Sequence, residues 1–196
     1  MIDRELKEVI KRCIREESEA LITLLESIDD VDSIFLDYLI NSKGNIIISG
    51  IGKSFSVGIK LAGTFASLGL SAVSIPATDM MHGNIGMIKN NDIVILISNS
   101  GETREVVELA KYLKIMNLGI VLSITGNVDS TIAKLSTLSK EIKVKEAGPF
   151  SVVPTSSTTA VMAYGDALAT AYAFAKKITL SSFIKCHPSG SIGNLL

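Results

Sequence analysis

Cysteine and histidine are scarce in this sequence of 196 residues, which contains only two of each. Cys13 and Cys186 lie far apart and there is no CxxC pair, which excludes a zinc knuckle and a thioredoxin-like redox motif. Two separate thiols are typical of the reducing cytosol, so we expect a cytoplasmic protein without disulfides. Two isolated histidines do not form a metal site, so we expect no bound metal.

An excess of charge of one sign is also missing. Lys and Arg together number 19, Asp and Glu together number 20, and the formal net charge is -1. A protein that binds nucleic acid needs a basic face to displace the counterions around the phosphates. We therefore expect no nucleic-acid partner.

No apolar run is long enough to indicate a membrane span. The longest apolar-rich stretch, 160–175, is rich in alanine and is interrupted by Gly165 and Asp166, so it predicts a buried helix. The N-terminus is charged from its third residue and lacks the apolar stretch of a signal peptide. Because the mean hydropathy is nevertheless +0.40 with 20% charged residues, we expect apolar surface to be buried between subunits.

The apolar pattern predicts a helical arm over residues 1–43 and a single α/β domain over 44–196. From residue 44 onward, short β-branched runs alternate with helical patterns, as in a parallel sheet that is covered on both faces. The expected strands are 46–48, 72–75, 93–97, 120–124 and a weaker 141–144, and the expected helices are 3–28, 31–42, 54–68, 77–82, 104–117, 156–177 and 179–186. The predicted fold is a doubly wound, flavodoxin-like three-layer αβα sandwich on a five-stranded parallel sheet.

Two nucleotide-binding motifs fail on their spacing. Gly52-Lys53-Ser54 resembles the end of a P-loop, but the required glycine five residues earlier is Ile47, inside an expected strand. The dinucleotide fingerprint begins with Gly50 and Gly52, but its third glycine is replaced by Phe55. The glycines then indicate a tight turn between a strand and a helix, with a lysine at the edge where ligands bind.

Hydroxyl side chains gather at two expected helix starts. Ser98, Ser100 and Thr103 surround Gly101 after the third strand, and a second cluster occupies 155–159. Hydroxyls and unpaired helix N–H groups can hold a phosphate dianion, although Ser and Thr also serve as ordinary helix caps. Because the arrangement occurs twice, we expect a phosphate site.

Glu102 and the two histidines are the candidate acid–base groups. A carboxylate in the first turn of a helix is favourable by itself. Beside a bound phosphate it would be repelled, which would raise its pKa toward that of a base able to take a proton next to a carbonyl. His82 and His187 both lie against glycine-rich turns rather than on an apolar helix face. A structural role stays open for each of the three.

Six short motifs occur in one order that resembles a known family. They are 50–54 (GIGKS), 82–87 (HGNIGM), 98–103 (SNSGET), 145–147 (KEA), 154–159 (PTSSTT) and 187–190 (HPSG). Together they are similar to the sugar isomerase (SIS) domain of D-arabinose-5-phosphate isomerases, from about residue 44 onward. The resemblance implies a tetramer without an organic cofactor that interconverts D-ribulose 5-phosphate and D-arabinose 5-phosphate. In this family the product supplies Kdo for lipopolysaccharide and some capsules. Family members usually carry two CBS domains after the last motif, and we expect a form without them.

The resemblance also carries over the family's functional residues. The catalytic lysine, the two glutamates and the C-terminal histidine fall on Lys53, Glu102, Glu146 and His187, and the other histidine falls on His82. We expect contacts to the substrate or its phosphate from Gly52, Ser54, Asp79, Ser98, Ser100, Thr103, Ser156 and Thr158. Asp79 and Asn84 depart from the family pattern, which leaves the substrate preference open.

The residues and the resemblance together predict an aldose–ketose isomerase that acts through an enediol. Glu102, or otherwise Glu146, moves the proton between C1 and C2. His187 or His82 opens the ring, and Lys53 stabilises the enediolate oxygen. The alternatives are an isomerase for hexulose or heptose phosphates, a non-catalytic sensor of sugar phosphates, and a subunit that only supports an assembly.

Overall fold

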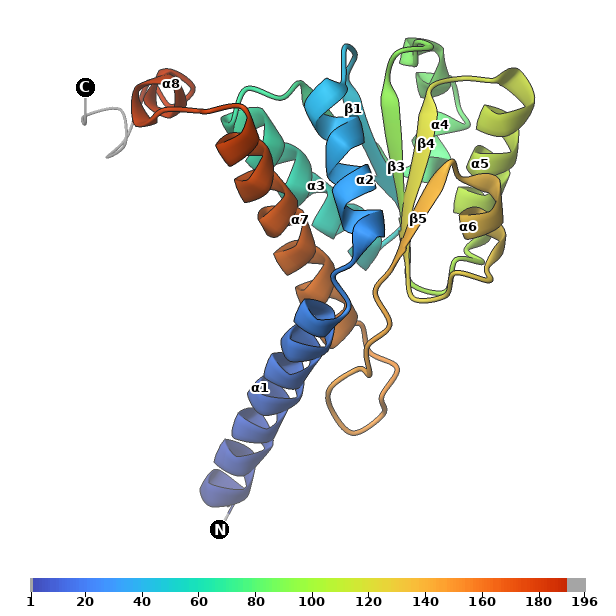
Figure 1. Cartoon of the computed structure of the whole chain (residues 1–196). Coiled ribbons are helices and arrows are strands. Elements are labelled where there is room, and N and C mark those ends of the chain that lie inside the picture. Colours follow the sequence, from blue (N-terminus) through green and yellow to red (C-terminus); the bar gives the residue numbers. More distant parts are fainter. Residues whose placement is uncertain (1, 190–196) are drawn as a thin grey trace.

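The computed structural model describes residues 2–189 and confirms the predicted five-stranded parallel sheet (Figure 1). The order of the strands is β2-β1-β3-β4-β5, and every neighbouring pair is parallel. The strands are β1 (Ile46–Gly50), β2 (Ala72–Ser74), β3 (Ile93–Ser98), β4 (Ile120–Thr125) and β5 (Leu138–Glu141).

The two central strands are buried along their whole length, because helices cover both faces of the sheet. β1 and β3 pair in register from Ile46 opposite Ile93 to Gly50 opposite Ile97. The chain turns to β2 on one side of this pair and to β4 on the other side. The carboxyl ends of β1 and β3 therefore form a switch point, where doubly wound sheets bind their ligands.

Helices form the two outer layers of the sandwich (Figure 1). One face is covered by α2 (Asp30–Asn41), α3 (Lys53–Ser67) and α7 (Ser156–Ala175), and the other by α4 (Ala77–Met80), α5 (Arg104–Met116) and α6 (Thr131–Leu135). Gly165 lets α7 approach α3 closely, since a Cβ at this position would overlap the Leu61 side chain. Both helices begin at the carboxyl edge of the sheet, since α3 follows the end of β1 and α7 follows the segment after β5.

Three elements differ from the sequence-based expectation. The last strand covers 138–141 instead of 141–144, although the buried Ile142 continues the edge by donating its N–H to the Thr125 carbonyl at 2.7 Å. The apolar residues Ile142 and Val144 after the strand shifted the predicted position of β5 toward the C-terminus. Sequence analysis also missed α6 and the short 3-10 helix η1 (Asn84–Met87). Both are too short to produce a helical period.

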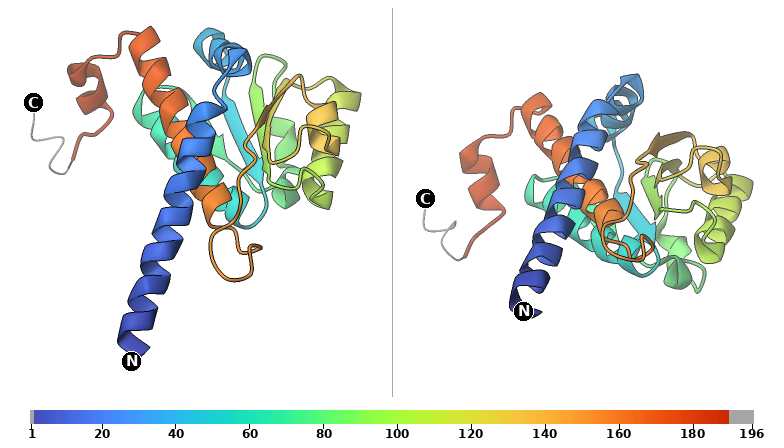
Figure 2. Two further views of the ribbon diagram at one scale, coloured as in Figure 1. Left: turned by 60° about the horizontal axis from the view of Figure 1, so that its bottom comes forward. Right: turned by 90° about the horizontal axis from the view of Figure 1, so that it is seen from below.

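The helical arm consists of α1 (Ile2–Glu26), which extends past the carboxyl edge of the sheet beside the start of α7 (Figures 1 and 2). Ala20 and Leu24 are buried and attach its second half to the domain. The first half exposes large apolar side chains: Leu6, Val9, Ile10 and Ile14. The following helix α2 is part of the domain, because Phe35 and Leu39 are fully buried in the core.

A buried ion pair fixes the junction between α1 and α2. Lys140 of β5 is only 3% exposed, and its Nζ donates to Oδ2 of Asp32 and to the carbonyl of Ser27, both at 2.7 Å. The same Nζ lies 5.8 Å from the ring centre of Tyr164, and burial together with the Asp32 carboxylate raises the pKa of this tyrosine. The cluster therefore ties the root of the arm to the edge strand and to α7.

The described residues contain no helix with both the length and the apolarity needed to cross a bilayer.

Candidate active site

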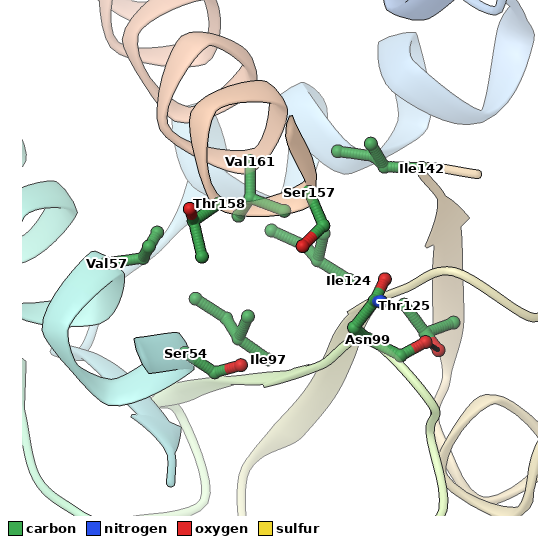
Figure 3. Close-up of a pocket in the computed structure, with 10 residues that line it drawn as sticks. All are labelled: Ser54, Val57, Ile97, Asn99, Ile124, Thr125, Ile142, Ser157, Thr158 and Val161. Carbon is green, nitrogen blue, oxygen red and sulfur yellow. Dashed lines mark hydrogen bonds between the residues drawn. The ribbon is translucent and has the colours of Figure 1, made fainter. Parts of the chain in front are cut away.

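A small cavity, open to solvent, lies at the carboxyl edge of the sheet between the first turns of α3 and α7 (Figure 3). The ends of β3 and β4 form its floor. Its lining residues come from five segments of the chain: Ser54, Val57, Ile97, Asn99, Ile124, Thr125, Ile142, Ser157, Thr158 and Val161. The cavity lies at the switch point of the sheet, where the topology predicts a ligand.

The lining is apolar on the floor and polar at the rim. Hydroxyls come from Ser54, Thr125, Ser157 and Thr158, and Asn99 adds an amide. The N-cap of α3 is Gly52, whose φ of +58° favours glycine and which provides no side-chain cap. The first N–H groups of α3 therefore face the ligand edge without a capping side chain. This set of donors suits a small polyhydroxylated anion.

The turn 98–103 is held together by its own hydroxyls. Ser98 is 2% exposed, its Oγ lies 2.9 Å from Oγ1 of Thr103, and it accepts the N–H of Gly101 at 3.1 Å. Ser100 is exposed, and its Oγ accepts the N–H of Glu102 at 3.2 Å. These residues lie beside the cavity and do not line it. The hydroxyls of Ser98 and Thr103 are paired with each other inside the turn, and Ser100 is the exposed hydroxyl of the three.

Glu102 points to the opposite face of the sheet. Its Oε1 accepts the backbone N–H of Thr131 at 2.7 Å, and this contact caps α6. The side chain is fully exposed, and the Thr131 hydrogen bond lowers its pKa. The direction is opposite to the one that a neighbouring phosphate would produce. In this chain Glu102 is a helix-capping carboxylate on the far side from the cavity.

Glu146 is fixed at the start of α7. Its Oε2 accepts the N–H of Thr155 at 2.9 Å and that of Ser157 at 3.1 Å, while its Oε1 accepts a short hydrogen bond from the Ser157 hydroxyl. Partial burial raises the pKa of Glu146, but the hydrogen bonds from Ser157 and Thr155 outweigh burial, and the pKa is lowered overall. Since Ser157 also lines the cavity, the carboxylate is one hydrogen bond away from the cavity wall.

One expected contact falls on the neighbouring residue. Ser156 is fully buried and its hydroxyl has no hydrogen-bond partner among the described residues, so it does not reach the cavity. Ser157 lines the cavity instead, because the next residue of a helix is rotated by about 100°. Thr158 lines the cavity as expected.

The other expected groups lie at the rim or away from it. Lys53 is exposed in the first turn of α3, next to Ser54. His82 and Asp79 are exposed on the segment that follows β2 and are not part of the cavity lining. They are near each other in the chain, and the His82 N–H donates to the Asp79 carbonyl at 3.1 Å.

His187 lies at the other end of the domain. It follows α8 (Leu180–Lys185), which begins after the C-terminal end of α7 (Figure 1). Its Nδ1 is 2.9 Å from the Phe183 carbonyl, and its ring stacks on Phe183 with centres 4.2 Å apart. The 20 residues of α7 correspond to about 30 Å of helix, which separates His187 from Glu146 within one chain.

Asn99, Thr125 and Ser157 line the cavity but are not among the individual residues chosen from the sequence. They lie in segments where ligands are expected, since Asn99 follows β3, Thr125 ends β4 and Ser157 belongs to the cluster 155–159. Within residues 2–189 no group of three or more His, Cys, Asp or Glu side chains could hold a metal ion.

The fold and the cavity define a doubly wound α/β protein with a small pocket at its switch point that has a polar rim. The chain belongs to the SIS domain family, whose family model matches residues 38–171. This confirms the resemblance carried by the six motifs.

Three relatives illustrate the similarity. The chain is 37% identical over 187 residues to arabinose 5-phosphate isomerase KdsD of Salmonella typhi, which covers 95% of this chain and 57% of the relative. It is 39% identical over 198 residues to arabinose 5-phosphate isomerase KpsF of Escherichia coli, covering 100% and 60%. The chain therefore spans less than two thirds of the length of these curated relatives. The structure of the E. coli CFT073 protein c3406 in complex with arabinose 5-phosphate has a TM-score of 0.92 and 35% identity, over 96% of this chain and 100% of that chain.

Proposed function

We propose that this protein is an aldose–ketose isomerase that interconverts D-ribulose 5-phosphate and D-arabinose 5-phosphate through an enediol. The observation that carries the proposal is the cavity at the switch point, lined by four hydroxyls and an amide, in a chain that matches the arabinose 5-phosphate complex over 96% of its length. A linear pentose phosphate has hydroxyls and a dianion that such a lining can satisfy.

The proposed binding mode uses the helix starts. The phosphate binds at the exposed Ser100, at the half-buried Thr103 and at the first turn of α3, and Lys53 balances the negative charge that develops on the enediolate oxygen. The sugar hydroxyls bind Asn99, Ser157 and Thr158 inside the cavity. An enzyme of this type needs no cofactor for the proton transfer, because one carboxylate can remove and return the proton.

Glu146 is the carboxylate that we propose as the base. It is half-buried and hydrogen-bonded to Ser157 of the cavity wall, whereas Glu102 is fully exposed and caps α6 on the other face. The lowered pKa keeps Glu146 ionised at neutral pH. Sequence reasoning alone favoured Glu102, since it could not detect that Thr131 occupies this side chain.

The assembly that we propose is a homotetramer in which His187 serves the active site of another subunit. Its position about one α7 length from Glu146 supports this arrangement, and so does the exposed apolar surface of the arm. Light scattering after size-exclusion chromatography measures the assembly. A monomer at micromolar concentration would contradict this part of the proposal.

Substrate incubation tests the function. The protein is mixed with ribulose 5-phosphate and, separately, with hexulose and heptulose phosphates, and the products are identified by mass spectrometry and chromatography. We expect arabinose 5-phosphate from the first substrate. If only a hexulose or heptulose phosphate is turned over, that sugar phosphate is the substrate and the proposed one is wrong. Binding without turnover would indicate a sensor.

Solvent exchange tests the base. In deuterated water, Glu146→Gln should abolish exchange of the carbon-bound hydrogen of the substrate, because an amide cannot accept the proton. Glu102→Gln is the matched control and should retain exchange. Loss of exchange in Glu102→Gln with retention in Glu146→Gln would assign the base to Glu102.

A further inference from the structure

We propose that Glu16 and Glu17 of the arm are positioning residues for the Glu146 carboxylate. This inference rests on the proposed function, because it concerns the group that we propose as the base. It arises from two hydrogen bonds that connect α1 to the loop 147–155 and to the first turns of α7.

Glu16 holds the loop directly after Glu146. Its Oε2 accepts the N–H of Gly148 at 2.9 Å, two residues from the proposed base. Gly148 has a φ of +96°, so the chain reverses its course here, and the Ala147 N–H on its other side donates to Oγ1 of Thr155 at 2.9 Å. The backbone from 146 to 148 is therefore fixed on one side by α7 and on the other side by the arm.

Glu17 holds the helix on which Glu146 depends. Its Oε2 accepts the hydroxyl hydrogen of Thr159 at 2.8 Å, one turn after the N–H groups that bind Glu146. Both glutamates are half-buried, and Ala20 in the next turn of α1 is buried. This part of α1 is therefore packed against the domain. Adjacent residues of one helix thus reach both parts of the structure that orient the carboxylate.

The hydrogen bonds of Glu16 and Glu17 join α1 to parts of the chain that are distant in sequence. Glu16 and Gly148 are 132 residues apart, and Glu17 and Thr159 are 142 residues apart. The loop itself exposes Phe150, Val152 and Val153 and contains Ser151 at a φ of +48°, so its own packing contributes little to its position. The arm supplies the constraint that this loop lacks. A displacement of about 1 Å in a reacting group can reduce the rate by up to about 100-fold.

Three variants of the full chain test the inference. Glu16→Ala removes the acceptor while alanine preserves the helix. Glu16→Gln keeps a carbonyl oxygen that can accept from Gly148, so it should restore the function. Glu19→Ala is the matched control, because Glu19 is exposed on the same helix and lines the same surface groove as Glu16 and Glu146 without a side-chain hydrogen bond in the described part of the chain.

We expect kcat of Glu16→Ala to fall by about 10-fold with KM changed less than about 2-fold, since the proton transfer is affected more than binding. Glu16→Gln and Glu19→Ala should stay within about 2-fold of the original protein, a threshold well below the expected positioning loss. A loss of kcat in Glu16→Gln as large as in Glu16→Ala would overturn the hydrogen-bond argument, and so would an equal loss in Glu19→Ala.

A double variant separates positioning from general destabilisation. If Glu16 acts through the position of the Glu146 carboxylate, Glu16→Ala should cause little further loss of kcat in a Glu146→Asp background, where the shorter side chain has already moved the carboxylate. A full additional loss in that background would contradict the proposal.

Amide hydrogen exchange provides a measurement that does not depend on the substrate. Glu16→Ala should speed exchange in a peptide covering 146–157 relative to Glu19→Ala, while the peptides of β1 and β3 stay protected. Unchanged exchange would overturn the inference even in an active enzyme. Absence of any turnover, combined with faster exchange, would refute the proposed function and leave the anchoring role of Glu16 supported.

Discussion

Replacement of Lys140 by methionine should destabilise the protein strongly, because it removes one half of a buried ion pair. Lys140 is 3% exposed and Asp32 is 8% exposed, so neither charge can be compensated by water. Oδ1 of Asp32 has no hydrogen-bond partner among the described residues, and its Oδ2 would keep only the Asp29 N–H at 2.8 Å. Removing one partner of a buried ion pair lowers the free energy of unfolding by about 3–5 kcal/mol. Because the Asp29 N–H still partly compensates the Asp32 charge, we expect a loss at the lower end, about 3 kcal/mol.

The assay is urea unfolding followed by circular dichroism. With a urea dependence of about 2 kcal/mol per molar, a loss of 3 kcal/mol moves the midpoint by about 1.5 M. Protein concentration is held constant, because the proposed subunit association would contribute to the apparent stability. Lys143→Met is the control, since Lys143 is exposed and follows the same strand. It should change the free energy of unfolding by less than about 0.5 kcal/mol.

A second replacement decides whether the unpaired charge is the cause. In Lys140→Met combined with Asp32→Asn, the buried carboxylate is replaced by a neutral amide of the same shape, so part of the lost stability should return. A midpoint of Lys140→Met within about 0.5 M of the original protein would refute the reasoning. An equal or greater loss in the double variant would refute it as well.

Three further predictions concern the site. Ser157→Ala removes the hydroxyl hydrogen bond to the ionised form of Glu146 and should move the acidic limb of the kcat/KM profile to higher pH. An unmoved limb would show that Glu146 does not titrate in that limb. Because the pKa of Glu146 is lowered on folding, its stabilising contribution is present above the unfolded value of 4.5 and is lost as the pH falls through the folded value. Melting curves of the original protein and Glu146→Gln should therefore converge in acid. Gly101→Ala should cost about 1–3 kcal/mol, as its φ of +67° disfavours a side chain and a Cβ would overlap Ser130; unchanged stability would contradict this.

The sheet was predictable because the apolar pattern of its strands is continuous. Strands buried on both faces consist of β-branched runs, and the runs over 46–48, 93–97 and 120–124 all lie within observed strands. The prediction for β5 lay three residues too far toward the C-terminus, since most of this strand is only partly buried and the buried Ile142 extends the apolar pattern past the paired region. The five-residue helix α6 has no period to detect.

The side chains of the site were less predictable than the loops that carry them. Sequence alone places Glu102 in a first helical turn, but its partner Thr131 is the first residue of α6, and only the fold brings the Thr131 N–H within 2.7 Å of the carboxylate. Ser156 and Ser157 are equivalent in the sequence, and the rotation of α7 decides which of them reaches the cavity. The contact between Glu16 and Gly148 spans 132 residues and involves a backbone donor, which no motif can encode.

The length of α7 has a consequence for mixtures of subunits. Glu146 lies before its first turn and His187 lies beyond its last turn, so about 30 Å of helix separates the two groups within one chain. If each active site combines Glu146 of one subunit with His187 of another, Glu146→Gln and His187→Ala variants that are inactive alone should complement each other. Refolding them together would create some sites with both defects and some sites with none. The activity recovered in the mixture would then be proportional to the number of intact sites. If no activity is recovered, Glu146 and His187 of the same chain act in one site.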